Sequence, residues 1–317
     1  MAGNLQEVFD DFIMDRKAAG LSPATIKWYT FWSKRFVCFL RQRGLSLDVD
    51  RVTARIVREF IVSLQRGEVP GNPEQVRCPR ALSPATINNA FRALRAFFNW
   101  AEREGQIEAS PMRRMREPKV PEKAPPAFTR EEIAKLLSTA ANWGLMRERN
   151  YVILLLLLDT GIRLSELTGL TLDSVFLEDG YIKVKGKGSK ERLIPIGRVV
   201  QDALRKYIAE TRPEVETNAL FLTKDGRPLG NSGVQSLLRR IGRAAGLKAA
   251  IGPHKFRHTF AREYLINGGD LESLRRMLGH TSLEMARRYV NLVIDDLEAL
   301  HRKASPMDNL FARQEER

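Results

Sequence analysis

The chain has 317 residues, of which 43% are hydrophobic, so it is long enough to bury two separate cores. Its 52 lysines and arginines against 38 acidic residues give a formal net charge of +14, which indicates a polyanionic partner such as nucleic acid, although a ribosomal or membrane-surface protein would also fit. The two cysteines, Cys38 and Cys78, exclude a disulfide framework and a four-thiolate zinc site within one chain, and a reducing cytoplasm is the simplest location.

The sequence contains no pattern typical of a membrane or export segment. Residues 1–11 are acidic and lack the basic region and apolar core of a signal peptide. The apolar run at residues 153–158 is too short to span a bilayer. This run therefore predicts a buried helix, and we expect no membrane partner.

The first third of the chain has a helical pattern from Leu5 to about Arg116. Residues 21–26 and 82–87 have the same sequence, Leu-Ser-Pro-Ala-Thr-Ile. In each copy the serine is placed as an N-cap and the proline at the first helical position, so each predicts the start of a helix.

Aromatic residues follow both predicted helix starts at spacings typical of a buried face, from Trp28 to Phe39 and from Phe91 to Trp100. The basic residues between them are then expected on the opposite faces. Those faces are either simply solvated or contact DNA backbone. The basic residues are Lys27, Lys34, Arg35, Arg92 and Arg95.

Two segments rich in glycine or proline divide the chain. Residues 65–81 contain two glycines and three prolines and predict a long loop. Residues 117–126 contain four prolines, which is typical of an extended linker. We therefore predict a helical domain at residues 1–116 and a second domain at residues 127–317.

The second domain opens with a capping sequence at Thr129, which predicts a helix through Leu137. After the buried helix at residues 151–158, Gly161 interrupts the apolar run, and Arg163 begins a further helix. A buried guanidinium needs an anionic partner, and Glu166 lies three residues on. This pair is either an ordinary ion pair, or Glu166 holds Arg163 in position to bind a phosphate.

A β-hairpin is predicted next, because alternating residues at 181–185 and 192–196 flank the glycine-rich stretch 186–190. Its tip presents Lys187, which either touches a phosphate or delivers a proton. Residues 221–223 predict one more short strand, followed by a turn at residues 224–227. Helices are expected for most of the remainder, so the fold class is mainly α with a small β-sheet in the second domain.

The stretch from Gly252 to Asn291 concentrates histidine, arginine and tyrosine among apolar positions, a mixture suited to chemistry on a phosphate. Gly252 and Pro253 predict a helix start, which places His254 and Arg257 on one face. His254 and His258 have the spacing of a metal-binding pair. However, no glutamate follows His254 as in the metalloprotease motif, and Arg257 would repel a cation.

Leu278 and Gly279 predict the end of a helix, followed by a turn and a new helix capped by Thr281 or Ser282. His280 then lies at a junction where an imidazole can face a ligand. Tyr289 is nine residues further on and, taken alone, reads as a half-buried packing residue. The tail at residues 295–310 is expected to pack on its own domain or on a neighbour's.

In combination these motifs resemble the tyrosine recombinase (phage integrase) family, and most closely its Xer-like members, over nearly the whole chain. The motifs are Thr-Gly-Ile-Arg-Leu-Ser-Glu-Leu at 160–167, Gly-Lys-Gly-Ser-Lys at 186–190, His-Lys-Phe-Arg-His at 254–258, Leu-Gly-His-Thr at 278–281, and Tyr289. The loop at residues 65–81 is longer than in compact Xer proteins. The family's six catalytic residues match, in order, Arg163, Lys187, His254, Arg257, His280 and Tyr289.

The resemblance implies a two-domain architecture, with a helical DNA-clamping domain followed by an α+β catalytic domain. It further implies that Tyr289 attacks a DNA phosphorus to form a 3′-phosphotyrosine, with Glu166 as an accessory residue. The reaction needs no cofactor, metal or ATP. The implied partner is a double-stranded recombination site bound by a tetramer on two duplexes, homomeric or with a related recombinase, and with C-terminal segments exchanged between neighbours.

Two other functions are compatible with parts of this pattern. A DNA-binding regulator would retain the fold without the activity, although all six residues are present. A monomeric type IB topoisomerase shares the phosphotyrosine chemistry. The choice between chromosome resolution and mobile-element integration or excision does not follow from these motifs.

Overall fold

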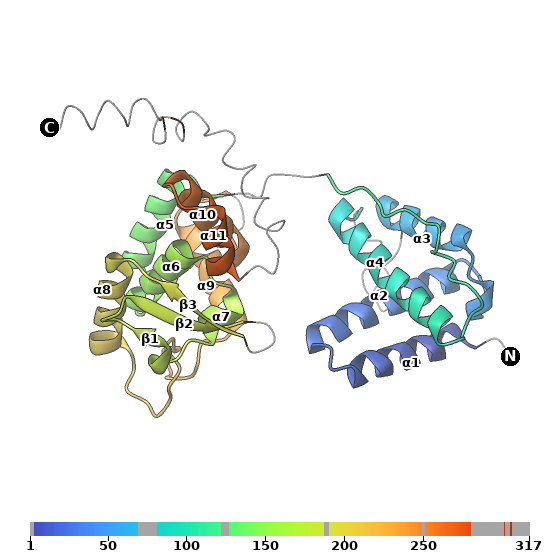
Figure 1. Cartoon of the computed structure of the whole chain (residues 1–317), viewed down its shortest axis with the longest axis horizontal. Helices are drawn as coiled ribbons and strands as arrows, with labels where there is room; N and C mark the ends of the chain where they lie inside the picture. The colour runs from blue at the N-terminus through green and yellow to red at the C-terminus, as the bar shows by residue number, and fades with distance from the viewer. Residues whose placement is uncertain are drawn as a thin grey trace. The chain divides into compact units, whose positions relative to one another are not determined.

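The computed structural model describes residues 3–68, 81–121, 127–186, 190–248 and 251–279, together with residues 301 and 305. The chain divides into two compact units, Met1–Glu122 and Lys123–Arg317 (Figure 1). The division falls within the proline-rich stretch 117–126. The chain is mostly helical with one small sheet, as the sequence predicts.

The first unit consists of four α-helices and a single 3₁₀ turn in its described part. The helices are α1 (Leu5–Ala18), α2 (Pro23–Gln42), α3 (Ala54–Arg66) and α4 (Pro84–Arg103), and the turn is η1 (Val49–Arg51). The repeated motif begins α2 and α4, as predicted. The Ser22 and Ser83 side chains accept hydrogen bonds from the amides of Thr25 and Thr86, which caps both helices.

The core of the first unit is built from aromatic rings on all four helices. The rings of Phe9 and Phe97 lie 3.9 Å apart between α1 and α4, and Phe36 of α2 makes edge contacts with Phe60 and Phe98. Such ring pairs add to the free energy gained by burying their area. The predicted aromatic core is therefore confirmed.

Three details of the first unit differ from the prediction. The helical pattern ends at Arg103 rather than near Arg116, and turns follow. Helix α3 continues to Arg66, so the loop predicted at residues 65–81 does not begin at residue 65, and most of that stretch lies outside the described residues. Arg35 is only 3% exposed and lies over the rings of Phe31 and Trp32, so it does not belong to a solvated face.

The second unit combines helices with a three-stranded antiparallel sheet of order β1-β2-β3 (Figure 1). The strands are β1 (Val175–Phe176), β2 (Tyr181–Lys185) and β3 (Glu191–Pro195). The α-helices are α5 (Arg130–Asn142), α6 (Arg147–Thr160), α7 (Leu164–Thr168), α8 (Arg198–Lys206), α9 (Asn231–Ala244), α10 (Pro253–Ile266) and α11 (Leu271–Leu278). A 3₁₀ turn (Leu172–Ser174) precedes β1, and a π-helical turn (Tyr207–Thr211) follows α8.

The predicted hairpin is confirmed, with its second strand beginning one residue earlier than expected. Val184 pairs with Arg192 and Lys185 with Glu191. The prediction of a strand at residues 221–223 is wrong, because this stretch forms only an isolated bridge between Leu222 and Pro228. The following turn is confirmed, with Gly226 in the left-handed region at φ 75°.

Helix α6 passes through the core of the second unit and packs against α5, α8 and α10. It extends beyond the predicted residues 151–158 at both ends. Within the described ranges, no helix combines the length and apolar character needed to cross a membrane. Helix α5 likewise runs past Leu137 to Asn142, and its predicted capping box between Thr129 and Glu132 is present.

Candidate functional site

The C-terminal end of α6 gives the candidate site its starting point. Gly161 ends the helix in the left-handed region at φ 58°, which glycine adopts without steric cost. A side chain at this position would collide with Phe260 and Leu278. The chain turns here and delivers Arg163 to the N-cap position of α7, close to α10 and α11.

Helix α10 supplies the second arginine. It begins at Pro253 after the N-cap Gly252, as predicted, and buries Phe256 and Phe260. Arg257 is only 6% exposed. Its Nη1 donates to the Gly161 carbonyl at 2.7 Å and its Nη2 to the Leu278 carbonyl at 2.6 Å.

Three arginines meet at the C-terminal end of α11, which ends at Gly279 in the left-handed region as predicted. The carbonyl of Met277 accepts from Arg192, that of Leu278 from Arg257, and that of Gly279 from Arg163. The last carbonyls of a helix have no partner within the helix and carry partial negative charge, so guanidiniums are favourable there. Three guanidiniums are thereby brought to successive residues of one chain segment.

Glu166 joins two of these arginines. Its Oε1 accepts from Arg163 Nη1 at 3.0 Å and from Arg192 Nη1 at 2.8 Å, and its Oε2 accepts from Arg192 Nη2 and the Arg163 amide, both at 2.8 Å. Burial raises the pKa of this carboxyl, but the bonds from Arg192 and Arg163 outweigh burial and lower the pKa to about 2. Glu166 is therefore a buried carboxylate at neutral pH.

We call Arg163, Glu166, Arg192 and Arg257, with the carbonyls of residues 277–279, the arginine site. Its three guanidiniums and one carboxylate leave a net positive charge. The side chain of Arg163 is 39% exposed. Among the described residues it makes two side-chain hydrogen bonds, which use two of its five N–H donors. The arrangement therefore suits a bound phosphate.

His254 and His258 lie on α10 beside this charge. His254 is exposed near the start of the helix, and His258 is half-buried one turn later. Burial lowers the pKa of His258, and the nearby charges of His254 and Arg257 lower it further. In the described ranges, no cluster of three or more His, Cys, Asp and Glu side chains is arranged as metal ligands.

Three of the predicted site residues, Lys187, His280 and Tyr289, lie outside the described residues. The residues that precede two of them, Gly186 and Gly279, lie at the arginine site. The carbonyl oxygen of Gly279 accepts a hydrogen bond from Arg163 Nη2, as described above. A Cβ built on Gly186 would lie 3.5 Å from Arg192 Nη1 and 3.6 Å from Glu166 Oε1. The helix start predicted at residues 281–282 and most of the tail at 295–310 also lie outside the described residues.

Arg192 is the member of the site that sequence reasoning missed. The hairpin pattern places it only as a residue of the second strand. The strand's alternation contained the signal, because Arg192 lies two residues before the buried Ile194 and so shares its face. An arginine on a core-facing strand position needs a buried anion, and Glu166 is that anion.

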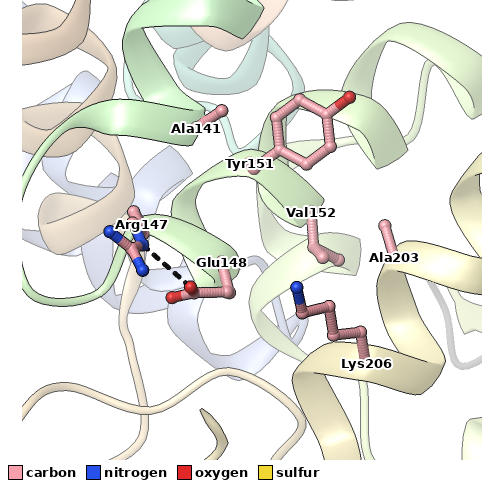
Figure 2. Close-up of a pocket in the computed structure, with 7 residues that line it drawn as sticks. All are labelled: Ala141, Arg147, Glu148, Tyr151, Val152, Ala203 and Lys206. Atoms are coloured by element: carbon pink, nitrogen blue, oxygen red, sulfur yellow. Dashed lines mark hydrogen bonds and ion pairs between the residues drawn. The ribbon is translucent and has the colours of Figure 1, made fainter. Parts of the chain in front are cut away.

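A separate shallow pocket of about 290 Å³ lies among α5, α6 and α8 (Figure 2). Arg147 and Glu148 form an ion pair at its edge, and Tyr151 contributes a ring. These residues belong to the N-terminal part of α6, whereas the arginine site begins beyond the C-terminal end of the same helix. The pocket is therefore distinct from the arginine site.

Comparison with known proteins agrees with both units. Residues 126–294 match the phage integrase family, and residues 8–108 match the phage integrase N-terminal SAM-like domain. Tyrosine recombinase XerC of Oceanobacillus iheyensis is 33% identical over 309 residues, which cover 96% of this chain and 96% of the relative.

Two solved structures share the fold. The XerH site-specific recombinase bound to palindromic difH substrate is 24% identical at a TM-score of 0.69, over 92% of this chain and 82% of that one. The Tn1549 transposon integrase in complex with transposon right end DNA is 21% identical at a TM-score of 0.73, over 96% of this chain and 100% of that one. The chain belongs to the phage integrase family and is an Xer-like tyrosine recombinase.

Proposed function

We propose that this protein cleaves and rejoins DNA strands at a specific site through a 3′-phosphotyrosine intermediate. The observation that supports this most directly is the meeting of Arg163, Arg192 and Arg257 at the end of α11. A phosphodiester carries one negative charge, and more charge builds up on its nonbridging oxygens during attack. Fixed guanidiniums aimed at those oxygens stabilise the transition state without reorganising.

In the proposed mechanism, Arg163 and Arg257 bind the nonbridging oxygens of the scissile phosphate. Arg163 has N–H donors beyond those it gives to Glu166 and Gly279, as described above. Planar guanidiniums suit two-point binding of phosphate oxygens. By analogy with oxyanion donors, losing one such contact costs about 3–4 kcal/mol of transition-state stabilisation.

The remaining catalytic roles are assigned to Lys187, His254, His280 and Tyr289. The Tyr289 oxygen forms a bond to phosphorus, and the bond from phosphorus to the 5′ oxygen breaks. The leaving oxygen keeps the electron pair and takes a proton from Lys187, while His254 assists removal of the phenol proton. His280 adds a hydrogen bond to the phosphate. Lys187 directly follows Gly186 in the chain, and His280 directly follows Gly279. Both glycines lie at the arginine site.

The proposed reaction needs no ATP and no metal. The phosphotyrosine ester retains the energy of the cleaved bond, so a free 5′-hydroxyl can reverse the reaction and rejoin a strand. The arginines already supply the positive charge that a divalent cation provides elsewhere. A test is full activity in the presence of a strong chelator of divalent cations.

We further propose the division of labour and the assembly. Residues 1–116 would clamp the duplex, residues 117–126 would link the domains, and residues 127–317 would perform catalysis and exchange a C-terminal segment with a neighbour. Four subunits, identical or with a related recombinase, would act on two duplexes in the cytoplasm. Because lysines and arginines displace counterions from DNA, binding should weaken steeply between low and moderate salt.

The nucleophile is tested with a nicked suicide substrate that traps the covalent adduct. Tyr289→Phe should bind DNA like the wild type and form no adduct, whereas Tyr151→Phe, at the pocket on α6, is the matched control and should form it. An adduct with Tyr289→Phe would refute the assignment.

The same substrate separates the alternative functions. A wild-type protein that binds DNA but never forms an adduct would be a DNA-binding regulator. A wild-type protein that relaxes supercoiled DNA as a monomer, without synaptic complexes containing two DNA sites, would be a topoisomerase. Recombination between two copies of the target site supports the proposal, and sequencing DNA crosslinked to the protein would identify that site.

A further inference from the structure

Arg192 connects strand β3 to both halves of the arginine site. Its two Nη atoms donate to both oxygens of Glu166, and its Nε donates to the Met277 carbonyl at 3.0 Å. Its side chain is 17% exposed, less than half the value for Arg163. On the basis of the recombinase function proposed above, we propose that Arg192 is a positioning residue for DNA cleavage, which orients Arg163 through Glu166.

The hydrogen bonds around Glu166 are divided unequally between the two arginines. Arg192 makes the two-point, side-by-side pairing, and the Arg163 side chain makes a single bond to Oε1. A two-point pairing with a carboxylate is the strongest pairing that a guanidinium makes. Because Arg192 occupies it, Glu166 holds Arg163 in place without taking the donors that a phosphate needs.

Removal of Arg192 would change that division. The Glu166 side chain is 1% exposed, and a buried carboxylate without a partner is costly. Glu166 would therefore pair more strongly with another cation inside the protein. Arg163 is the nearest guanidinium already bonded to it. The carboxylate would then compete with the DNA phosphate for Arg163, and cleavage would slow while the fold remained.

Arg192 also contacts the C-terminal end of α11. A Cβ built on Gly279 would lie 3.0 Å from the Arg192 Cζ, so glycine at this position lets the guanidinium approach closely. The carbonyls of Leu278 and Gly279 are held by Arg257 and Arg163. Arg192 therefore helps to position residues 277–279, whose carbonyls accept hydrogen bonds from both of these arginines.

The test compares two suicide substrates for Arg192→Met, Arg192→Lys and Arg163→Ala. One has a normal scissile phosphate, and the other has a methylphosphonate, in which a methyl group replaces one nonbridging oxygen and removes the charge. The control is Arg212→Met, because Arg212 also binds carbonyls, those of Thr217 and Ala219, away from the arginine site. Strand cleavage is measured in single turnovers at saturating protein, below the melting temperature of each variant.

With the normal phosphate, Arg192→Met should cleave about 10- to 100-fold more slowly than the wild type, by analogy with residues that orient the ligands of a metal site. Arg192→Lys should be intermediate, since lysine restores charge but not the two-point pairing. With the methylphosphonate the loss should shrink to a few-fold, as for Arg163→Ala. The double variant with Arg163→Ala should be no slower than Arg163→Ala alone.

Several outcomes would overturn the inference. Normal cleavage by Arg192→Met would do so, because Arg192 would then have no role in cleavage. An equal loss on both substrates, or losses that multiply with Arg163→Ala, would also do so, because these would indicate general damage of the kind that Arg212→Met reports. If the wild type itself forms no adduct, the proposed function fails, and this inference fails with it.

Discussion

Two glutamates of the second unit each pair with two arginines but lie in different surroundings. Glu166 accepts from Arg163 and Arg192, and Glu272 on α11 accepts from Arg275 and Arg276. For both carboxyls the pKa is lowered to about 2. Yet the Glu166 side chain is 1% exposed, whereas that of Glu272 is 45% exposed.

The difference shows that pairing alone does not identify a functional ion cluster. Water screens the charge of Glu272 in the folded protein, and in the unfolded chain water solvates the same charge nearly as well. A buried carboxylate has no such alternative, so its partners determine whether the site can form. The geometry of pairing is similar in the two clusters, and burial makes only one of them indispensable.

The largest expected effect comes from Glu166→Ala. This change leaves Arg192 buried without its anion and should destabilise the second unit by about 3–5 kcal/mol. It should also abolish adduct formation, because Arg163 loses its orientation. Denaturant unfolding, followed separately for each unit, measures the first effect. A loss no greater than that of Glu272→Ala would show that burial is not decisive.

The second-largest effect is expected on acidification, through the carboxyl of Glu166. A carboxyl whose pKa is lowered in the folded state contributes stability above its unfolded pKa near 4.5 and loses it as the pH falls through its folded value of about 2. For Glu166 this contribution is about 3 kcal/mol. The free energy of unfolding of wild type should therefore fall between pH 5 and pH 2 relative to Glu166→Gln. Parallel curves for the two proteins would contradict this prediction.

The third-largest effect is expected for Gly161→Ala, which should lower the free energy of unfolding by about 2 kcal/mol. A side chain there is strained at φ 58° and collides with Phe260. It should also slow cleavage, since the Gly161 carbonyl anchors Arg257. The matched control is Gly105→Ala in the first unit, at φ 70° with nothing within 4 Å of an added Cβ. Its cost should be limited to backbone strain of about 1 kcal/mol. Equal melting temperatures of the two variants would contradict this reading.

The smallest effect is expected for Glu272→Ala. Its melting temperature should match that of the wild type within experimental error, and its rate of adduct formation should be unchanged. A clear loss of stability that disappears in high salt would show that the surface cluster contributes more than its exposure indicates.

The sequence by itself determined the helices, their caps and the family. Ser22, Ser83, Thr129, Gly161 and Gly279 act within a few residues of their own position, so local patterns suffice to predict them. The same holds for the hairpin. The failures at residues 104–116 and 221–223 occurred where the local pattern was compatible with both a regular element and a turn.

The tertiary structure alone decided which charged residues belong together. Arg192 lies 26 residues from Glu166 in sequence, and Met277 lies 85 residues from Arg192. Helix spacing predicts the pair of Arg163 and Glu166, but no local rule predicts that a strand arginine takes the two-point pairing with the same carboxylate. Local periodicity encodes which face of an element is buried, whereas the partner of a buried charge depends on how distant elements pack.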